Sequence, residues 1–155
     1  MTAKKRHGGL PSLFSKFLWI VKLTTPMNVA IYRLSGGRLM NKMEGCPVCI
    51  VTMTGHKSGQ KRTIALMYVP DGDNVLLVAS LGGAPNNPAW YQNFKARPEI
   101  EIEVGKSRRK MLAHEANPEE YAKVWPKAVA AYPSYAEYQK NTTRVIPVFI
   151  CTPQR

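Results

Sequence analysis

Hydrophobic and polar residues alternate with a helical period at the beginning of the chain and with a strand-like period in much of the rest. From Ser12 to Leu23, apolar residues recur at helical spacing with lysines among them, which predicts an amphipathic helix. A second helix is predicted from Thr25, with a proline in its first turn, to the glycine pair that starts at Gly36. We therefore expect a basic amphipathic segment over residues 1–24, followed by a single domain over residues 25–155.

Strand-like segments occupy much of the remaining chain. Short runs rich in β-branched residues predict strands at residues 46–53, 63–69, 75–79, 99–104, 107–115 and 145–151. A polar loop with two glycines separates the first two runs, and a Pro-Asp-Gly-Asp-Asn turn at residues 70–74 separates the second from the third. We expect the first three strands to form an antiparallel meander.

Further helices are expected between and after these strands. Asn87 predicts the N-cap of a helix over residues 88–96, and Asn117 that of a helix over residues 118–131. A capping box at residues 134–137 predicts a short third helix. Six or so antiparallel strands with flanking helices indicate the α+β class and a small barrel.

Length and composition limit the classes of function. A chain of 155 residues is typical of one domain, and no apolar run reaches the roughly 18 residues that a membrane-spanning helix needs. The formal net charge of +12 favours nucleic acid, an anionic membrane surface or an acidic small molecule as the partner. Three sparse cysteines and a beginning unlike a signal peptide indicate a reducing, cytoplasmic location.

The loop between the first two strands is the first candidate site. Its sequence is Thr54-Gly55-His56-Lys57-Ser58-Gly59-Gln60, and it continues into Lys61 and Arg62. Glycines let the backbone approach a ligand closely, and free amides beside cations bind anions. The loop lacks the spacing of a nucleotide-binding P-loop and leads into a strand. A phosphate-binding hairpin and an ordinary solvated hairpin remain equal alternatives at this point.

A second glycine-rich loop, residues 80–88, leaves another strand and leads into a helix. A helix N-terminus beside flexible glycines favours anions, and the two loops are able to face one pocket. Trp90 and Tyr91 follow this loop and have the shape to lie against a flat ring. Tyr132, Tyr135 and Tyr138 are spaced to gather on one side of a helix, either in a pocket or in the core.

Other motifs carry less chemistry. Cys46-Pro47-Val48-Cys49 opens a strand, so we expect packing cysteines and not a redox pair. His7, His56 and His114 lack the spacing of a metal site, and no metal is expected.

Several of these motifs, taken together, resemble those of a known family. The run from Thr54 to Thr63, the Asp-Gly-Asp-Asn turn, V-A-S-L-G-G-A-P-N-N-P-A-W-Y-Q-N-F-K-A-R-P and Y-P-S-Y-A-E-Y resemble, in order and spacing, the deazaflavin-dependent nitroreductases of actinobacteria. The resemblance covers nearly all of the chain from Pro26 onward. It implies a split β-barrel that binds the reduced 8-hydroxy-5-deazaflavin coenzyme F420.

The resemblance also implies a division of the site. The residues that would line the phosphate end of the coenzyme are Thr54, His56, Lys57, Ser58, Gly59, Gln60 and Arg62, and those that would flank its ring are Ser80, Leu81, Gly82, Trp90, Tyr91 and Asn93. The three tyrosines would line the acceptor pocket. The chain departs from the nitroreductase at His56, where an arginine is common, at Leu81, where a lysine occurs, and at Met67, where that enzyme has a tyrosine. The first two changes lower the positive charge, and the third makes the substrate pocket more apolar.

The expected activity is hydride transfer from reduced F420 to a conjugated acceptor. Quinones, enones and other activated alkenes are the acceptors considered, with nitroimidazoles as fortuitous ones, and the proton would come from a tyrosine or from water. The alternatives are a barrel that binds flavin mononucleotide (FMN), a basic nucleic-acid binder and a coenzyme carrier without turnover. We expect no nucleic acid, because aromatic residues do not interleave with the basic runs. A peripheral contact of residues 1–24 with an anionic membrane is a hypothesis that liposome flotation would test.

Overall fold

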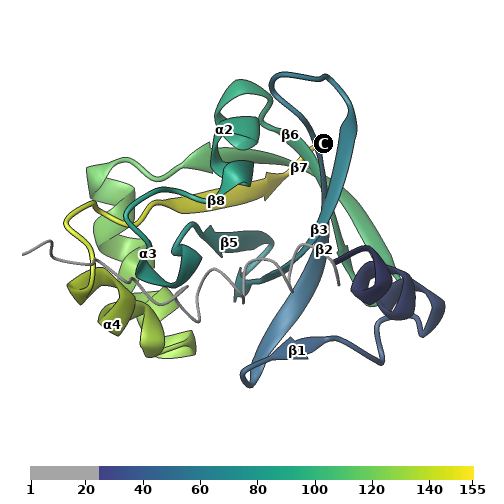
Figure 1. Ribbon diagram of the computed structural model, residues 1–155, viewed down its shortest axis with the longest axis horizontal. Coiled ribbons are helices and arrows are strands. Elements are labelled where there is room, and N and C mark those ends of the chain that lie inside the picture. The colour runs from purple at the N-terminus through teal and green to yellow at the C-terminus, as the bar shows by residue number, and fades with distance from the viewer. Residues whose placement is uncertain (1–24) are drawn as a thin grey trace, which may run out of the picture.

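The structure, a computed structural model, describes residues 25–155 (Figure 1). The predicted helix at residues 12–23 lies outside the described residues, whereas residues 25–34 are helical as predicted. The strands are β1 (Lys42–Met43), β2 (Cys46–Thr54), β3 (Lys61–Met67), β4 (Val69–Asp71), β5 (Asn74–Val78), β6 (Glu99–Val104), β7 (Ser107–Glu115) and β8 (Val148–Pro153). The helices that follow residues 25–34 are the short 3₁₀ turn η1 (Leu81–Gly83), α2 (Ala89–Ala96), α3 (Pro118–Ala131) and α4 (Ser134–Lys140).

All the strands belong to one strongly curled antiparallel sheet. The strand order is β1-β2-β6-β7-β8-β5-β4, and β3 pairs with β2 along its full length, from Val48 opposite Met67 to Thr54 opposite Lys61. The sheet curls into an open half-barrel, with α2 at one end and with α3 and α4 together at one side (Figure 1). The predicted α+β split β-barrel is confirmed.

The predicted meander is wrong in its third strand. The hairpin at Asp71–Asn74 forms as expected, but it joins β5 to the short β4 and not to β3. The other neighbour of β5 is the last strand, β8, with Val75 opposite Cys151. Local turn signals fix hairpins but not this long-range pairing, which brings the middle of the chain beside its last strand.

Several predicted boundaries and caps also need correction. The last strand is Val148–Pro153 and not residues 145–151, because Val145 lies exposed before the strand begins. Asn117 caps α3 as predicted, in a capping box with Glu120. Neither α2 nor α4 has a side-chain cap, so the predicted caps at Asn87 and at residues 134–137 do not form.

The core is divided by the sheet. One cluster is built on Cys49, Val51, Met53 and Phe149 and includes the rings of Trp90 and Phe94 from α2. A second cluster packs against α3 and α4. Alternate residues of β2 therefore serve opposite faces, as the strand period predicts.

The helical residues 25–34 dock on the turn between β6 and β7. The Tyr32 hydroxyl accepts a hydrogen bond of 2.7 Å from the Gly105 amide, and Arg33 binds the buried carboxylate of Glu103. Among the described residues, no helix is long and apolar enough to cross a membrane.

Candidate functional site

The loop between β2 and β3 is a compact turn stapled by its own backbone. The Gly55 amide donates to the Gln60 carbonyl at 2.8 Å, and the Gly59 amide donates to the Gly55 carbonyl at 2.9 Å. The Ser58 hydroxyl accepts from the Gln60 amide at 3.2 Å. A Cβ at Gly55 would lie 2.8 Å from the Ser58 Oγ, so the Ser58 side chain would have to turn away from its bond with the Gln60 amide. The glycines therefore have the tight-turn role that the sequence predicts.

The cations of this loop have no acidic partners. Within residues 25–155, Lys57, Lys61 and Arg62 form no ion pair, although all three side chains are exposed. The amides of Lys57 and Ser58 donate to no group in the same part of the chain. Free amides beside unpaired cations are the components of an anion site.

Asn93 of α2 holds the loop against the barrel. Its Oδ1 accepts from the His56 amide at 2.9 Å and from the His56 ring Nδ1 at 2.7 Å, while its Nδ2 donates to the Met53 sulfur at 3.4 Å. A carbonyl oxygen only accepts, so the His56 ring carries its proton on Nδ1 in this contact. Residues that the family resemblance assigned to opposite ends of the coenzyme, His56 and Asn93, are thus in direct contact.

Trp90 and Tyr91 of α2 have structural partners. Trp90 is buried, with its ring 4.8 Å from that of Phe94 and 5.8 Å from that of Phe149. The Tyr91 hydroxyl donates to Glu115 at 2.8 Å, and burial together with this carboxylate raises the pKa of Tyr91 to about 12. Their predicted contact with a coenzyme ring stays a prediction.

The second predicted loop has an unusual backbone. Leu81, Gly82 and Gly83 all have positive φ, of 45°, 63° and 80°. This conformation costs a leucine about 1 kcal/mol, so neighbouring groups must stabilise it. The Ser80 carbonyl accepts from the Gly83 amide at 2.9 Å, and the Ser80 side chain is buried.

Arg144, which the sequence reasoning missed, supports this loop from beneath. Its guanidinium donates to the carbonyls of Ala79, Ser80 and Ala84 at 3.2, 2.8 and 2.9 Å, and to the Asn87 side chain at 2.8 Å. The residue follows two threonines in an irregular stretch, and no sequence signal distinguished it from the other surface cations.

The three tyrosines come together as the sequence predicts. Ring centroids lie 4.9 Å apart for Tyr132 and Tyr135 and 6.2 Å apart for Tyr132 and Tyr138, and the hydroxyls of the latter pair are 3.2 Å apart. Tyr132 and Tyr135 are buried, whereas Tyr138 is half-buried. Met67 and Cys46 belong to the larger hydrophobic cluster that includes these tyrosines, and the Cys46 thiol donates to the Ala131 carbonyl. Burial raises the pKa of Tyr135 and of Tyr138, so both hydroxyls keep their protons at neutral pH.

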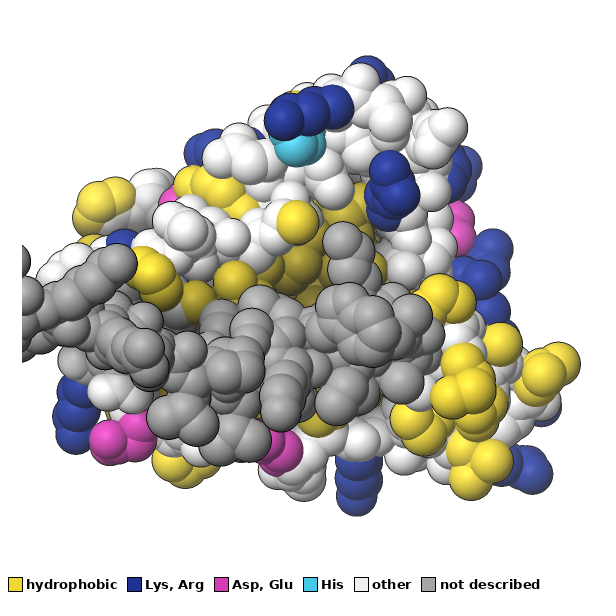
Figure 2. Space-filling model, in the orientation of Figure 1, with side chains coloured by type: hydrophobic (Ala, Val, Ile, Leu, Met, Phe, Trp, Pro, Cys, Tyr) yellow, Lys and Arg dark blue, Asp and Glu magenta, His cyan; other side chains and the backbone are white. Residues whose placement is uncertain are grey.

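The open side of the half-barrel has a hollowed surface. Figure 2 shows a recess below α2 on the open side of the half-barrel, with hydrophobic side chains on its floor and basic side chains on the rim above it. An apolar floor with a cationic rim is suited to a ligand that combines a flat ring with an anionic tail.

The comparisons with known proteins agree with this geometry. A family model described as F420H(2)-dependent quinone reductase matches residues 25–153. The chain belongs to this family. It is 41% identical over 127 residues to an F420H(2)-dependent quinone reductase of Mycobacterium tuberculosis (strain ATCC 25618 / H37Rv), which covers 79% of this chain and 85% of the relative. The predicted assignment to the deazaflavin-dependent reductases, and hence to the oxidoreductases, is confirmed.

Solved structures support the same assignment. An F420-H2-dependent reductase designated FDR-A is 45% identical, with a TM-score of 0.64 over 68% of this chain and 93% of that chain. A second structure, described as a domain-swapped dimer, is 38% identical, with a TM-score of 0.67 over 88% of this chain and 99% of that chain.

The cysteines of this F420H(2)-dependent quinone reductase family member pack as predicted. All three are buried free thiols, and burial raises the pKa of Cys49 to about 12, which keeps it an unreactive thiol. Within residues 25–155, no group of His, Cys, Asp and Glu side chains is arranged to hold a metal ion.

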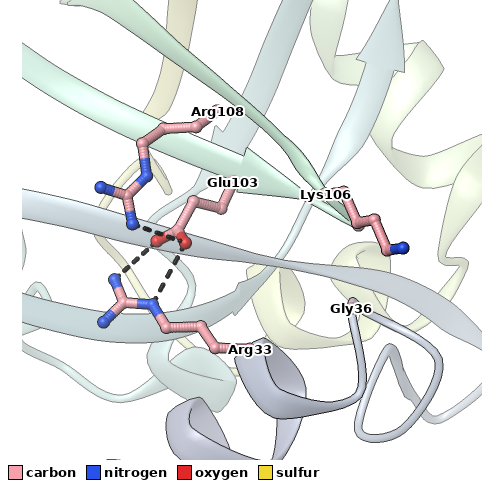
Figure 3. Close-up of a pocket in the computed structure, with 6 residues that line it drawn as sticks. Arg33, Gly36, Glu103, Lys106 and Arg108 are labelled. Carbon is pink, nitrogen blue, oxygen red and sulfur yellow. Dashed lines mark hydrogen bonds and ion pairs between the residues drawn. The ribbon is translucent and has the colours of Figure 1, made fainter.

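A separate cavity of about 320 Å³ lies where the helical residues 25–34 meet the β6–β7 turn. Figure 3 shows the Glu103 carboxylate between Arg33 and Arg108, with the amine of Lys106 directed away from it. Burial opposes ionisation of Glu103, but the hydrogen bonds from both arginines outweigh burial and lower its pKa. The sequence had not predicted a functional site at these residues. The ion pair of Glu103 with Arg33 joins the helical residues 25–34 to the barrel.

Proposed function

We propose that this protein transfers a hydride from reduced coenzyme F420 to a quinone. The observation that carries the proposal is the group of unpaired cations and free amides in residues 55–62, held on the rim of the apolar recess by Asn93. The family name gives the donor and the acceptor class, and the charge and shape of this site fit both.

The β2–β3 loop would bind the anionic part of the coenzyme. F420 carries a phosphodiester and a glutamate tail, so it presents several negative charges. Lys57 and Arg62 would pair with these charges without first breaking an ion pair within the described residues, and the amides of Lys57 and Ser58 would add neutral donors. When bound, the reduced deazaflavin supplies a hydride from its ring. The loop's contribution is orientation and affinity.

The tyrosine cluster would hold the acceptor. A quinone oxygen gains negative charge as the ring accepts a hydride, and a neutral hydroxyl within reach stabilises that charge. Tyr138 is half-buried while Tyr132 and Tyr135 are buried, so Tyr138 is the most accessible of the three residues. It would donate a hydrogen bond to the quinone oxygen. One hydride and one proton together convert the quinone to the hydroquinone.

The apolar surroundings limit the acceptors to conjugated, weakly polar molecules. Met67 and Cys46 belong to the same hydrophobic cluster as the tyrosines, and neither offers a strong hydrogen bond. Quinones and enones suit such a pocket, whereas nitroimidazoles would be fortuitous acceptors.

The test is an anaerobic assay with reduced F420 and a soluble naphthoquinone. We expect oxidation of the coenzyme with equal formation of hydroquinone, and slower turnover with an enone. Parallel reactions with reduced FMN and with reduced nicotinamide coenzyme serve as controls. Turnover with FMN and none with F420 would overturn the proposal in favour of a flavin-binding barrel.

We also propose a peripheral contact with anionic membranes, where lipid-soluble quinones reside. Large apolar side chains are exposed between residues 27 and 43, and Leu34 is 89% exposed. The others are Met27, Leu39, Met40 and Met43. Figure 2 shows this hydrophobic patch at the lower right, with basic side chains around it. Apolar protrusions beside lysine and arginine are suited to an anionic lipid surface.

Flotation of the full chain with vesicles tests whether the exposed patch binds the membrane. We expect recovery with phosphatidylglycerol vesicles to fall for Leu34→Ser/Leu39→Ser but not for Val145→Ser, an exposed apolar position far along the chain from the patch. Equal recovery of all three proteins would remove the patch from the proposal. Deleting residues 1–24 tests the N-terminal contact separately. A cytoplasmic location stays a prediction.

A further inference from the structure

Arg144 occupies the connection between α4 and β8 and binds four acceptors of one loop. Its Nε donates to the Ala84 carbonyl, its Nη2 to the Ser80 carbonyl, and its Nη1 to both the Ala79 carbonyl and the Asn87 side chain. All four acceptors are neutral, and within residues 25–155 the guanidinium has no ion pair with an acid. The side chain therefore serves the shape of the loop.

The loop needs such support because its own hydrogen bonds are few. Two backbone bonds, from Gly83 to Ser80 and from Ala84 to Leu81, span its three consecutive residues with positive φ. The Ala79 carbonyl and the Asn87 side chain have no other hydrogen bond in the described chain. Without the guanidinium these acceptors would lose their partner, and the loop would sample other conformations.

The same loop is in contact with the tyrosine helix. A Cβ on Gly83 would lie 2.7 Å from the Tyr138 carbonyl oxygen and 3.1 Å from the Tyr138 Cα, so only glycine permits this approach. The next residue, Gln139, donates to the Arg144 carbonyl at 2.7 Å and accepts from the Ile146 amide at 2.9 Å. Helix α4 thus holds the backbone of Arg144, and the side chain of Arg144 holds the loop.

We propose that Arg144 is a positioning residue that fixes the loop at residues 79–87 against α4, so that the donor side and the acceptor side of the pocket keep one separation. The inference rests on the proposed function, in which the loop flanks the coenzyme ring and Tyr138 contacts the quinone. Hydride transfer depends steeply on the distance between donor and acceptor, so a loosened loop lowers turnover more than it lowers coenzyme binding. Lysine is no substitute, because one ammonium does not span four acceptors.

Two variants test the contact from its two sides. Arg144→Lys keeps the charge but removes the fork of donors, and Gly83→Ala pushes the loop away from Tyr138. Gly72→Ala is the matched control, because Gly72 also has a positive φ, of 61°, but a Cβ there would meet nothing within 4 Å. Coenzyme affinity, kcat per bound coenzyme, the quinone KM and amide hydrogen exchange are measured for each protein.

We expect Arg144→Lys and Gly83→Ala to lower kcat by about 10- to 100-fold while the coenzyme Kd changes little, since the anionic tail binds the other loop. In the double variant kcat should fall little further than in either single variant, because both changes disrupt the same contact between the loop and α4. In the absence of coenzyme, amides at residues 79–87 should exchange faster in both variants, whereas those of the β2–β3 loop should not. Gly72→Ala should resemble the wild type in all of these.

Wild-type kcat and wild-type exchange in Arg144→Lys would overturn the inference, as would additive losses in the double variant. If activity falls only in proportion to the number of coenzyme-binding sites per protein molecule, the variants have lost folded protein and nothing else, and the inference is again overturned. Absence of any F420 turnover in the wild type is a different result, which refutes the proposed function. The exchange data are independent of turnover and still report whether Arg144 holds the loop.

Discussion

Replacing Glu103 with glutamine should destabilise the fold, because this carboxylate joins the helical residues 25–34 to the barrel. Glu103 is 7% exposed and accepts from Arg33 at 3.1 and 2.6 Å and from Arg108 at 3.0 Å. Glutamine keeps one acceptor, but its amide group places donors against a guanidinium donor. Glutamine therefore has the shape of Glu103 but cannot accept from both arginines with both of its terminal atoms.

The size of the effect follows from the exposure of the partners. Removing one member of a fully buried ion pair costs about 3–5 kcal/mol. The side chains of Arg33 and Arg108 are 40% and 55% exposed, so both can turn toward water when Glu103 is replaced. We therefore expect a loss of about 2 kcal/mol in the free energy of unfolding, or about 4–8 °C in Tm for a domain of this size.

The pH dependence gives a second check. The arginines hold the pKa of Glu103 below its ordinary value of 4.5 in spite of burial, so its stabilisation is complete above that value. It disappears as the pH falls through the lower pKa of the folded state. The difference between wild type and Glu103→Gln should accordingly be full at neutral pH and should close in acid.

Urea unfolding followed by tryptophan fluorescence at neutral and acidic pH measures both quantities. Glu119→Gln is the control, since its pair with Lys123 joins side chains that are 84% and 73% exposed and contributes little. A Glu103→Gln variant as stable as the wild type at neutral pH would refute the reasoning. A difference that persists unchanged in acid would refute the electrostatic part of it.

Three further predictions concern the site. Asn93→Ala removes both hydrogen bonds to His56, so the coenzyme Kd should rise about 5- to 30-fold, measured by fluorescence titration, while Asn141→Ala, at an exposed asparagine after α4, should leave it unchanged. Tyr138→Phe should lower kcat for a naphthoquinone about 10- to 100-fold in steady-state assays with little change in coenzyme affinity, because one neutral donor to the developing charge is lost; an unchanged kcat would exclude that role. Met67→Tyr adds a hydroxyl to the tyrosine cluster and should shift the ratio of kcat/KM values toward more polar acceptors, and a ratio equal to that of the wild type would show that Met67 does not line the pocket.

The sequence predicted those features that depend on local patterns. Strand alternation placed Cys46 and Cys49 on opposite faces of β2, and the glycines predicted the turns at residues 54–60 and 70–74. Tyrosine spacing predicted the cluster that Tyr132, at the end of α3, forms with Tyr135 and Tyr138 of α4. In each of these the decisive contacts lie within a few residues, where backbone geometry alone sets which side chains meet.

The features that escaped prediction depend on distant parts of the chain. Pairing of β5 with β8 joins residues 70 or more positions apart, and no turn signal encodes it. Asn87 resembles a helix cap in sequence, but its side chain is used by Arg144 in the structure. Likewise Glu103 belongs to an alternating strand that predicts an exposed acid, and a helix 70 positions earlier buries it.

Titration of the protein with oxidised F420 tests the central claim most directly. Quenching of tryptophan fluorescence would be followed in the wild type, in Lys57→Ala/Arg62→Ala, and in Lys110→Ala/Lys123→Ala, a control with the same loss of charge elsewhere on the surface. We predict that the wild type binds F420 more tightly than FMN. Of the two variants, only Lys57→Ala/Arg62→Ala should lose affinity for F420, by about tenfold or more. Added salt should weaken F420 binding by the wild type, because it screens these charges. Preference for FMN, or equal F420 binding by all three proteins, would contradict the account.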